Sequence, residues 1–284
     1  MTSRVSRPRL ERIAASLDER SWRVVRILAE HRFTTTNQLA RLHQSHHKTA
    51  ASALRQTARL IRHLQTLSLV HHLERCIGGQ RAGSTGLIWY LTEHGFRLLA
   101  INVERHTTTH HRNAEPSTRF LTHTLAVMEA RVLAEETSQR RGVRLLRVNT
   151  EPLCWRSHLG IHGNPEWVKP DLEIVTQMEG YEDHWWLEID LDTEHPKRLL
   201  VKAHAYLRHY QSGIEQNQRG VFPVIVWVTA TSDRAGRIAD LMAADPRLPE
   251  GMFAIACLNN LQTLLAPSPA VRASEGPENQ GNPS

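Results

Sequence analysis

Three acidic side chains in the C-terminal half of the chain stand where two apolar strands would bring them together. Asp171 follows Pro170 at the start of "DLEIV", and Glu188 and Asp190 alternate within "HWWLEIDL". Alternate residues of a strand share a face, so Glu188 and Asp190 lie on the side of Trp186. Unpaired carboxylates are costly inside a sheet, so they must lie at an exposed strand end, pair with cations or bind a metal. If the two strands meet at one edge, the three carboxylates converge.

Such a set of oxygens suits Mg²⁺ or Mn²⁺, which polarises a phosphodiester and activates water. The segment "VKAHAYLRHY" downstream places Lys202 and Tyr206 one turn apart on a predicted helix. Lys202 is the candidate for stabilising charge or positioning water, and Tyr206 for orienting that water. The alternative for this segment is an ordinary amphipathic helix that packs its aromatic side chains.

Positive charge is concentrated in the first part of the chain. Residues 1–110 hold 17 Lys and Arg against 7 Asp and Glu, a net charge of +10, whereas residues 111–284 hold 18 against 22, a net charge of −4. A module with this charge is expected of a polyanion binder, because each cation near a phosphate releases condensed counterions. Charge of this kind also occurs on basic surfaces that bind no nucleic acid.

One predicted helix, beginning near Ser45, carries this charge as a stripe. Side chains at steps of four, three, four and three share one of its faces: Lys48, Ser52, Arg55, Arg59 and Arg62. Leu54, Ile61 and Leu64 lie on the other side. No Asp or Glu occurs from Lys48 to Leu73, whereas a solvated helix face usually mixes signs. The pattern is typical of a helix that enters the major groove of double-stranded DNA.

The neighbouring segments frame this helix. We expect a helix over 16–32, then a short helix with Thr36 as its N-cap, and after the basic helix a β-hairpin with Arg75 and Arg81 near its Gly-rich turn. In this order the elements resemble the winged helix-turn-helix family over about residues 16–101. The resemblance implies that the basic helix reads DNA while the hairpin, or wing, contacts the backbone or minor groove.

The rest of the chain alternates helices and strands. A long helix over 117–140 leads to five apolar strands, and helices separate the last three of them. The expected strands span 143–148, 172–176, 185–191, 222–229 and 253–258, and the separating helices span 196–211 and 232–244. This order predicts an α/β domain with a mixed central sheet that is covered on both sides.

The order of elements and acids resembles the PD-(D/E)XK nuclease superfamily, with Asp171 opening one strand and Glu188 on the next. The resemblance implies a restriction-endonuclease-like fold, Mg²⁺ ligation by Asp171, Glu188 and Asp190, and a further ligand at Glu129 on the long first helix. Asp190 stands where the superfamily usually has its catalytic lysine, and a carboxylate cannot replace an ammonium beside developing negative charge. Lys202 therefore either restores this chemistry from the following helix, or the site is inactive.

The whole arrangement is similar to the replication-relaxation family of bacterial plasmids and mobile elements, over about residues 16–266. The specific part is "EIDLDTE" followed by Lys202, Tyr206 and Tyr210. The resemblance implies a DNA-binding protein acting in DNA relaxation, replication or mobilisation, with metal-dependent endonuclease or nickase chemistry as one reading. The alternative is a non-catalytic transcriptional regulator or accessory factor with a degenerate nuclease fold. A third reading makes Tyr206 a nucleophile, as in relaxases, but no histidine pocket for a metal accompanies it.

The chain is thus expected to have five segments. They are a basic arm (1–15), a winged-helix domain (16–101), a linker (102–116), a nuclease-like domain (117–266) and a disordered tail (267–284). The histidines of the linker indicate a basic loop and no metal site. Three scattered cysteines, no membrane-length apolar run and no leader favour a cytoplasmic protein. Its expected partners are double-stranded DNA, a second copy in a homodimer, and replication or mobilisation proteins, with no membrane.

Overall fold

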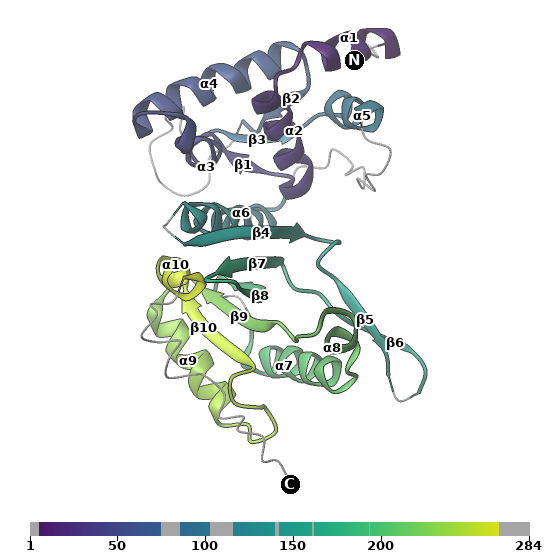
Figure 1. Ribbon diagram of the computed structural model, residues 1–284, viewed down its shortest axis with the longest axis vertical. Helices are drawn as coiled ribbons and strands as arrows, with labels where there is room; N and C mark the ends of the chain where they lie inside the picture. The colour runs from purple at the N-terminus through teal and green to yellow at the C-terminus, as the bar shows by residue number, and fades with distance from the viewer. Residues whose placement is uncertain are drawn as a thin grey trace. The chain divides into compact units, whose positions relative to one another are not determined.

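The chain forms two compact units (Figure 1). The computed structural model describes residues 6–74, 86–102, 116–139, 142–160, 162–192 and 194–266. The first unit comprises Met1–Val132 with Thr150–Cys154, and the second comprises Leu133–Asn149 with Trp155–Ser284. The division lies inside helix α6 (Thr118–Ser138), and not in the expected linker, because Met128 and Val132 pack into the core of the first unit.

The first unit combines helices with a small sheet. Its helices are α1 (Arg7–Ser16), α2 (Glu19–His31), α3 (Thr36–Leu42), the 3-10 turn η1 (Gln44–His46), α4 (Ala50–Thr66) and α5 (Glu93–Asn102), and its strands are β1 (Thr34–Thr35), β2 (Val70–His72) and β3 (Ile88–Leu91). β3 lies between β1 and β2 and is antiparallel to both. The predicted pairing of the two hairpin strands is therefore confirmed. Arg75 and Arg81, predicted near the hairpin turn, lie outside the described residues.

Polar caps set where these helices begin. The Asp18 carboxylate accepts a hydrogen bond from Ser21 N, so the helix predicted over 16–32 begins later, as α2 at Glu19, and a separate helix, α1, precedes it. Thr35, and not Thr36, caps α3, where it forms a capping box with Gln38.

Helix α1 occupies most of the segment that the sequence predicts as a basic arm. Pro8 lies in the first turn, where its missing N–H costs no hydrogen bond. Leu10 and Ile13, three residues apart, are buried in the same core as Trp22. These two apolar residues anchor α1 to the core. The arginines around them gave the segment the composition of a basic arm, so the helix was not predicted.

The second unit is built on a five-stranded sheet in the order β10-β9-β8-β7-β4. Its strands are β4 (Val143–Thr150), β7 (Leu172–Met178), β8 (Tyr181–Asp190), β9 (Val224–Thr229) and β10 (Phe253–Cys257). β7 and β8 are antiparallel, whereas β8, β9 and β10 are parallel. The predicted mixed central sheet is therefore confirmed.

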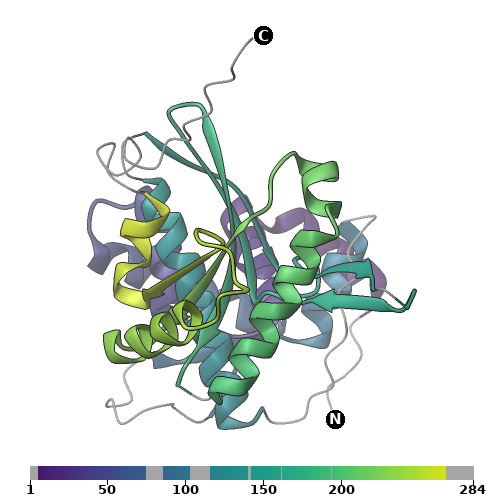
Figure 2. The same cartoon turned by 90° about the horizontal axis from the view of Figure 1, so that it is seen from below.

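Helices complete this unit: α7 (Pro196–Gln211), α8 (Ile214–Arg219), α9 (Ser232–Ala243), the 3-10 turn η3 (Leu258–Asn260) and α10 (Leu261–Leu265). α7 and α9 lie across one face of the sheet, as Figure 2 shows. On that face, Trp186 and Trp227 of the sheet pack with Tyr206 of α7. A β-hairpin of β5 (Arg156–Leu159) and β6 (Pro165–Val168), which the sequence analysis missed, precedes β7.

Some of the predicted segments lie wholly or largely outside the described residues. The predicted tail, 267–284, and all of the predicted linker except its two ends lie outside the described residues. Cys154 and Cys257 are free thiols, and Cys76 lies outside the described residues. Within the described ranges, none of the helices combines the length and the apolar content of a membrane span.

Candidate functional site

The basic face of α4 is shorter than the sequence suggested. Thr49 caps the helix, so Lys48 precedes it and is not part of the helical stripe. The Ser52 hydroxyl is engaged in the cap, where it accepts from Thr49 N and donates to Thr49 O. The buried side of α4 also differs, because it is centred on Ala53 and Thr57 along with the predicted Ile61 and Leu64, whereas Leu54 is only half-buried.

Three arginines remain on the exposed side of α4: Arg55, Arg59 and Arg62. None of them makes an ion pair within the described part of the chain. By contrast, Arg41 of α3 pairs with Glu129 and Arg131 pairs with Glu30 in the same unit. The arginines of α4 therefore present positive charge that the described residues leave uncompensated.

In the second unit, the start of β7 lies beside the end of β8. The Asp171 amide donates to Leu187 O over 2.9 Å, and its carboxylate Oδ2 accepts from Ile189 N over 2.7 Å. Asp171 and Glu188 are thus brought close together, while the Glu188 side chain is buried. Burial raises the pKa of Glu188 to about 7, and the negative charge of Asp171 adds to the rise.

Helix α7 supplies two partners for this buried carboxylate. Lys202 Nζ lies 2.9 Å from Glu188 Oε2, and the Tyr206 hydroxyl donates to Glu188 Oε1 over 2.5 Å. Lys202 Nζ also lies 3.0 Å from Glu194 Oε1. Burial opposes the charge on Lys202, but the carboxylates of Glu188 and Glu194 outweigh it and raise the pKa of the ammonium. The Lys202 side chain is 40% exposed, so the cluster reaches solvent through it.

Asp190 has a different partner. It lies on the predicted face of β8, but both Nε and an Nη of Arg234 donate to Asp190 Oδ2, over 2.9 and 2.6 Å. Both side chains are buried, and Arg234 also donates to Glu194 O. The sequence predicts Asp190 as a ligand beside Glu188, whereas in the structure an arginine of α9 neutralises the charge of its carboxylate.

Glu129, the other predicted ligand, belongs to the first unit. Its carboxylate accepts from Gln38 Nε2 over 3.0 Å and pairs with Arg41, both on α3. The described residues contain no group of three or more His, Cys, Asp or Glu arranged to hold a metal ion. Of the four predicted ligands, the structure brings together Asp171 and Glu188, and gives Asp190 and Glu129 arginine partners.

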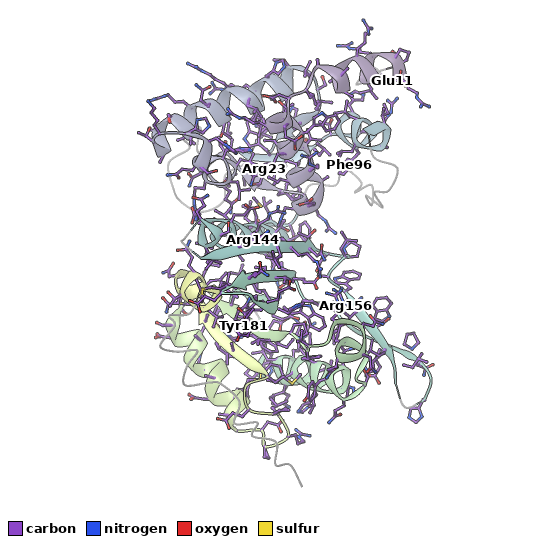
Figure 3. The ribbon with its side chains drawn as sticks, in the orientation of Figure 1. Glu11, Arg23, Phe96, Arg144, Arg156 and Tyr181 are labelled. Carbon is purple, nitrogen blue, oxygen red and sulfur yellow. The ribbon has the colours of Figure 1, made fainter. Side chains whose placement is uncertain are left out.

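A second buried acidic cluster was missed in the sequence. Glu173 of β7 accepts from Asn149, Arg156 and Arg219, and Arg156, labelled in Figure 3, lies over the ring of Trp186. Burial alone would raise the pKa of Glu173, but the hydrogen bond from Asn149 and the two arginine charges outweigh it and lower that pKa. The cluster is charge-compensated from within the unit.

Two further residues at the site were missed, although the sequence held a signal for one of them. Asp190 ends a buried strand and requires a cation. Arg234 follows the next strand by only a few residues, at the start of a helix that returns along the same face. Glu194, which pairs with Lys202, lies in the turn before α7 and had no comparable signal.

Comparison with known proteins assigns the chain to a family. Neither a search of curated proteins nor a search of solved structures found a match. The family model described as replication-relaxation matches residues 25–225, which is more than half of the chain. The match includes α4 with its basic face and the cluster of Asp171, Glu188 and Lys202. The chain belongs to the replication-relaxation family.

Proposed function

We propose that this protein binds double-stranded DNA through α4 and acts in the replication of a plasmid or mobile element. Membership of the replication-relaxation family supports the biological setting. In this proposal α2, α3 and α4 with the hairpin of β2 and β3 form a winged helix. α4 enters the major groove, and the wing that carries Arg75 and Arg81 contacts the backbone.

The observation that carries the proposal is the exposed face of α4. Arg55, Arg59 and Arg62 follow one another at steps of four and three, which an α-helix places on one side. Because the described residues provide no carboxylate partner for them, these guanidinium groups are available to phosphates and guanine edges. A helix face kept free of acids in this way favours a polyanion as its partner.

The proposal is tested by measuring the affinity of the full chain for fluorescent duplex DNA. The double variant Arg55→Gln/Arg62→Gln should weaken binding by about tenfold or more, because it removes two phosphate or base contacts. The matched control is Arg9→Gln/Arg12→Gln, which removes the same charge from exposed positions on α1. Equal affinities for the two double variants would contradict the assignment of α4.

A second candidate function, phosphodiester cleavage, is favoured by the cluster at the end of β8. A buried carboxylate with a raised pKa, a second acid and a partly exposed lysine come together there. Asp171 and Glu188 would hold a divalent cation such as Mg²⁺ or Mn²⁺, which would polarise the phosphate. Both Glu188 oxygens accept hydrogen bonds from α7. One of these oxygens would therefore have to be released before Asp171 and Glu188 could bind a cation together.

In this second function, residues of the chain would supply the remaining steps. Lys202 would place positive charge beside the phosphate oxygens as negative charge develops on them. Tyr206 would keep Glu188 oriented through its hydrogen bond. The position of Asp190 contributes no ligand, because Arg234 holds it.

Plasmid nicking separates the two functions. Supercoiled plasmid is incubated with Mg²⁺ or Mn²⁺ and wild-type protein, with Asp171→Asn, Glu188→Gln or Lys202→Met, and with the exposed control Lys197→Met on the same helix. Nicking that the first three variants lose and the control retains would support cleavage. An intact plasmid with both metals would leave the second unit as a non-catalytic scaffold and the DNA-binding proposal unchanged.

A further inference from the structure

A recess of about 470 Å³ lies in the first unit beside the proposed DNA-binding face. One wall is the junction of α1 and α2, and the other is α4. Its polar lining includes Arg20, His43, His47, Arg59 and His63. The volume lies within the range of small-molecule sites, about 300 to 1,000 Å³. The recess is therefore large enough for a ligand of nucleotide size.

The lining carries more positive than negative charge. Arg20 and Arg59 are exposed and make no ion pair among the described residues. Asp18 is the single acid among the described lining residues. Its carboxylate accepts from Ser21 N as the cap of α2. Hydrogen bonds from the side chain and the amide of Ser21, followed by the charge of Arg20, lower the pKa of Asp18. Two arginines against one acid leave the lining with a net positive charge.

The pKa of His43 is affected by the same positive charges. Burial, followed by the charges of Arg23, His46, Arg20 and His47, lowers the pKa of His43 to about 4. Arg23 lies on α2 and is labelled in Figure 3. His43 is 3% exposed, and its Nε2 has no hydrogen-bond partner among the described residues. The recess thus contains a neutral imidazole in surroundings that disfavour any further positive charge.

We propose that this recess binds the phosphate group of a nucleotide. Arginine guanidinium groups on two facing walls suit a phosphate, because each offers N–H donors in a planar fork. Leu17 and Leu60 add apolar surface to the same lining, on which a base or sugar can rest. The nucleotide is either free in solution or part of a DNA strand.

A free nucleotide in the recess would compete with DNA. Arg59 lines the recess and also belongs to the exposed stripe of α4, so one guanidinium cannot serve both ligands fully. This competition rests on the proposed DNA binding. The phosphate site itself does not, because Arg20 and the histidines lie outside the stripe.

The test uses the full chain and isothermal titration with adenosine monophosphate and with inorganic phosphate. The variant Arg20→Gln removes a cation from the recess and leaves the stripe intact, and Arg12→Gln is the control on exposed α1. We expect binding of the mononucleotide to weaken about tenfold in Arg20→Gln, because a charge-assisted contact is lost, and to stay unchanged in the control. Equal thermal unfolding of the two variants would show that the fold is retained.

A parallel titration with duplex DNA distinguishes the sources of the phosphate. Loss of mononucleotide binding in Arg20→Gln, together with displacement of DNA by mononucleotide from the wild type, identifies a free ligand. No mononucleotide binding, but weaker DNA binding with a smaller salt dependence in Arg20→Gln, identifies a DNA phosphate. If Arg20→Gln changes neither titration, the phosphate site is wrong. Mononucleotide binding by a protein that does not bind DNA would overturn the proposed function and leave the phosphate site supported.

Discussion

Arg234 holds Asp190 through two nitrogens of its guanidinium group, which lie 2.9 and 2.6 Å from one carboxylate oxygen. The two residues are 44 positions apart and come from β8 and α9. Because both are buried, the pair has little access to water that could solvate a charge left alone. The acid that sequence analysis assigned to chemistry is therefore half of a structural ion pair.

Removing this arginine should destabilise the second unit strongly. Arg234→Met leaves a buried carboxylate without its cation, which typically costs about 3 to 5 kcal/mol. The control is Arg237→Met, on the same helix as Arg234. It breaks an exposed ion pair with Asp192 and should cost less than about 1 kcal/mol. Urea unfolding followed by tryptophan fluorescence measures both. Coincident unfolding curves for the two variants would show that the buried pair has no special role.

Glu188 should make stability depend on pH in metal-free buffer. Its pKa is about 7 in the folded protein against an ordinary value of 4.5, so the folded state binds the extra proton between these values. The contribution of this proton to the free energy of unfolding is fully present below pH 4.5 and is lost as the pH rises towards about 7. The loss is at most about 3 kcal/mol. Glu188→Gln should remove this loss. The measurement compares the urea midpoints of wild type and variant at about pH 5 and about pH 8. If both proteins show the same change between these pH values, Glu188 is not the source of the pH dependence.

His43 should have the opposite effect on the first unit. Burial and neighbouring cations lower its pKa from 6.5 to about 4, so the unfolded chain binds the proton first as the solution is acidified. Its contribution is present above pH 6.5 and is lost as pH falls towards 4. His43→Gln should therefore flatten the acid side of the stability profile, measured by circular dichroism in urea at several pH values. An unchanged profile would contradict this assignment.

Two helical glycines should respond differently to substitution by alanine. A Cβ on Gly95 of α5 would clash with the backbone oxygen of Leu69, so Gly95→Ala should destabilise the first unit by about 1 to 3 kcal/mol. A Cβ on Gly236 of α9 would meet nothing within 4 Å, so Gly236→Ala should be neutral or stabilise by up to about 1 kcal/mol. Thermal unfolding of both variants measures the contrast. Stabilisation by Gly95→Ala would mean that α5 does not pack this closely against Leu69.

The periodicity of the sequence was sufficient to predict most elements of the second unit. The alternation in "HWWLEIDL" places Trp186, Glu188 and Asp190 on one face, and all three face α7 or α9 in the structure. Pro196 at the start of α7 marks a helix boundary that was predicted correctly. Local patterns succeed here because each element has a continuous apolar side that only one secondary structure can bury.

The partners of the acids were not predictable in the same way. Glu188 meets Lys202 and Tyr206, one helix further along, and that pairing could be inferred from the helical spacing. Asp190 meets Arg234 only because β9 runs parallel to β8 and returns α9 over the same face. Such a pairing depends on the order of strands in the sheet, which periodicity does not specify. The α1 helix was missed for a different reason: only Leu10 and Ile13 mark its buried side, which is too few residues to show a helical period.

The central claim is that α4 binds DNA through its exposed arginines, and the salt dependence of binding tests it most directly. The logarithm of the association constant is plotted against the logarithm of the salt concentration for wild type, Arg55→Gln and Arg62→Gln. If each arginine contacts a phosphate, each substitution should reduce the slope by about 0.9. A wild-type slope retained by both variants, at unchanged affinity, would contradict the claim.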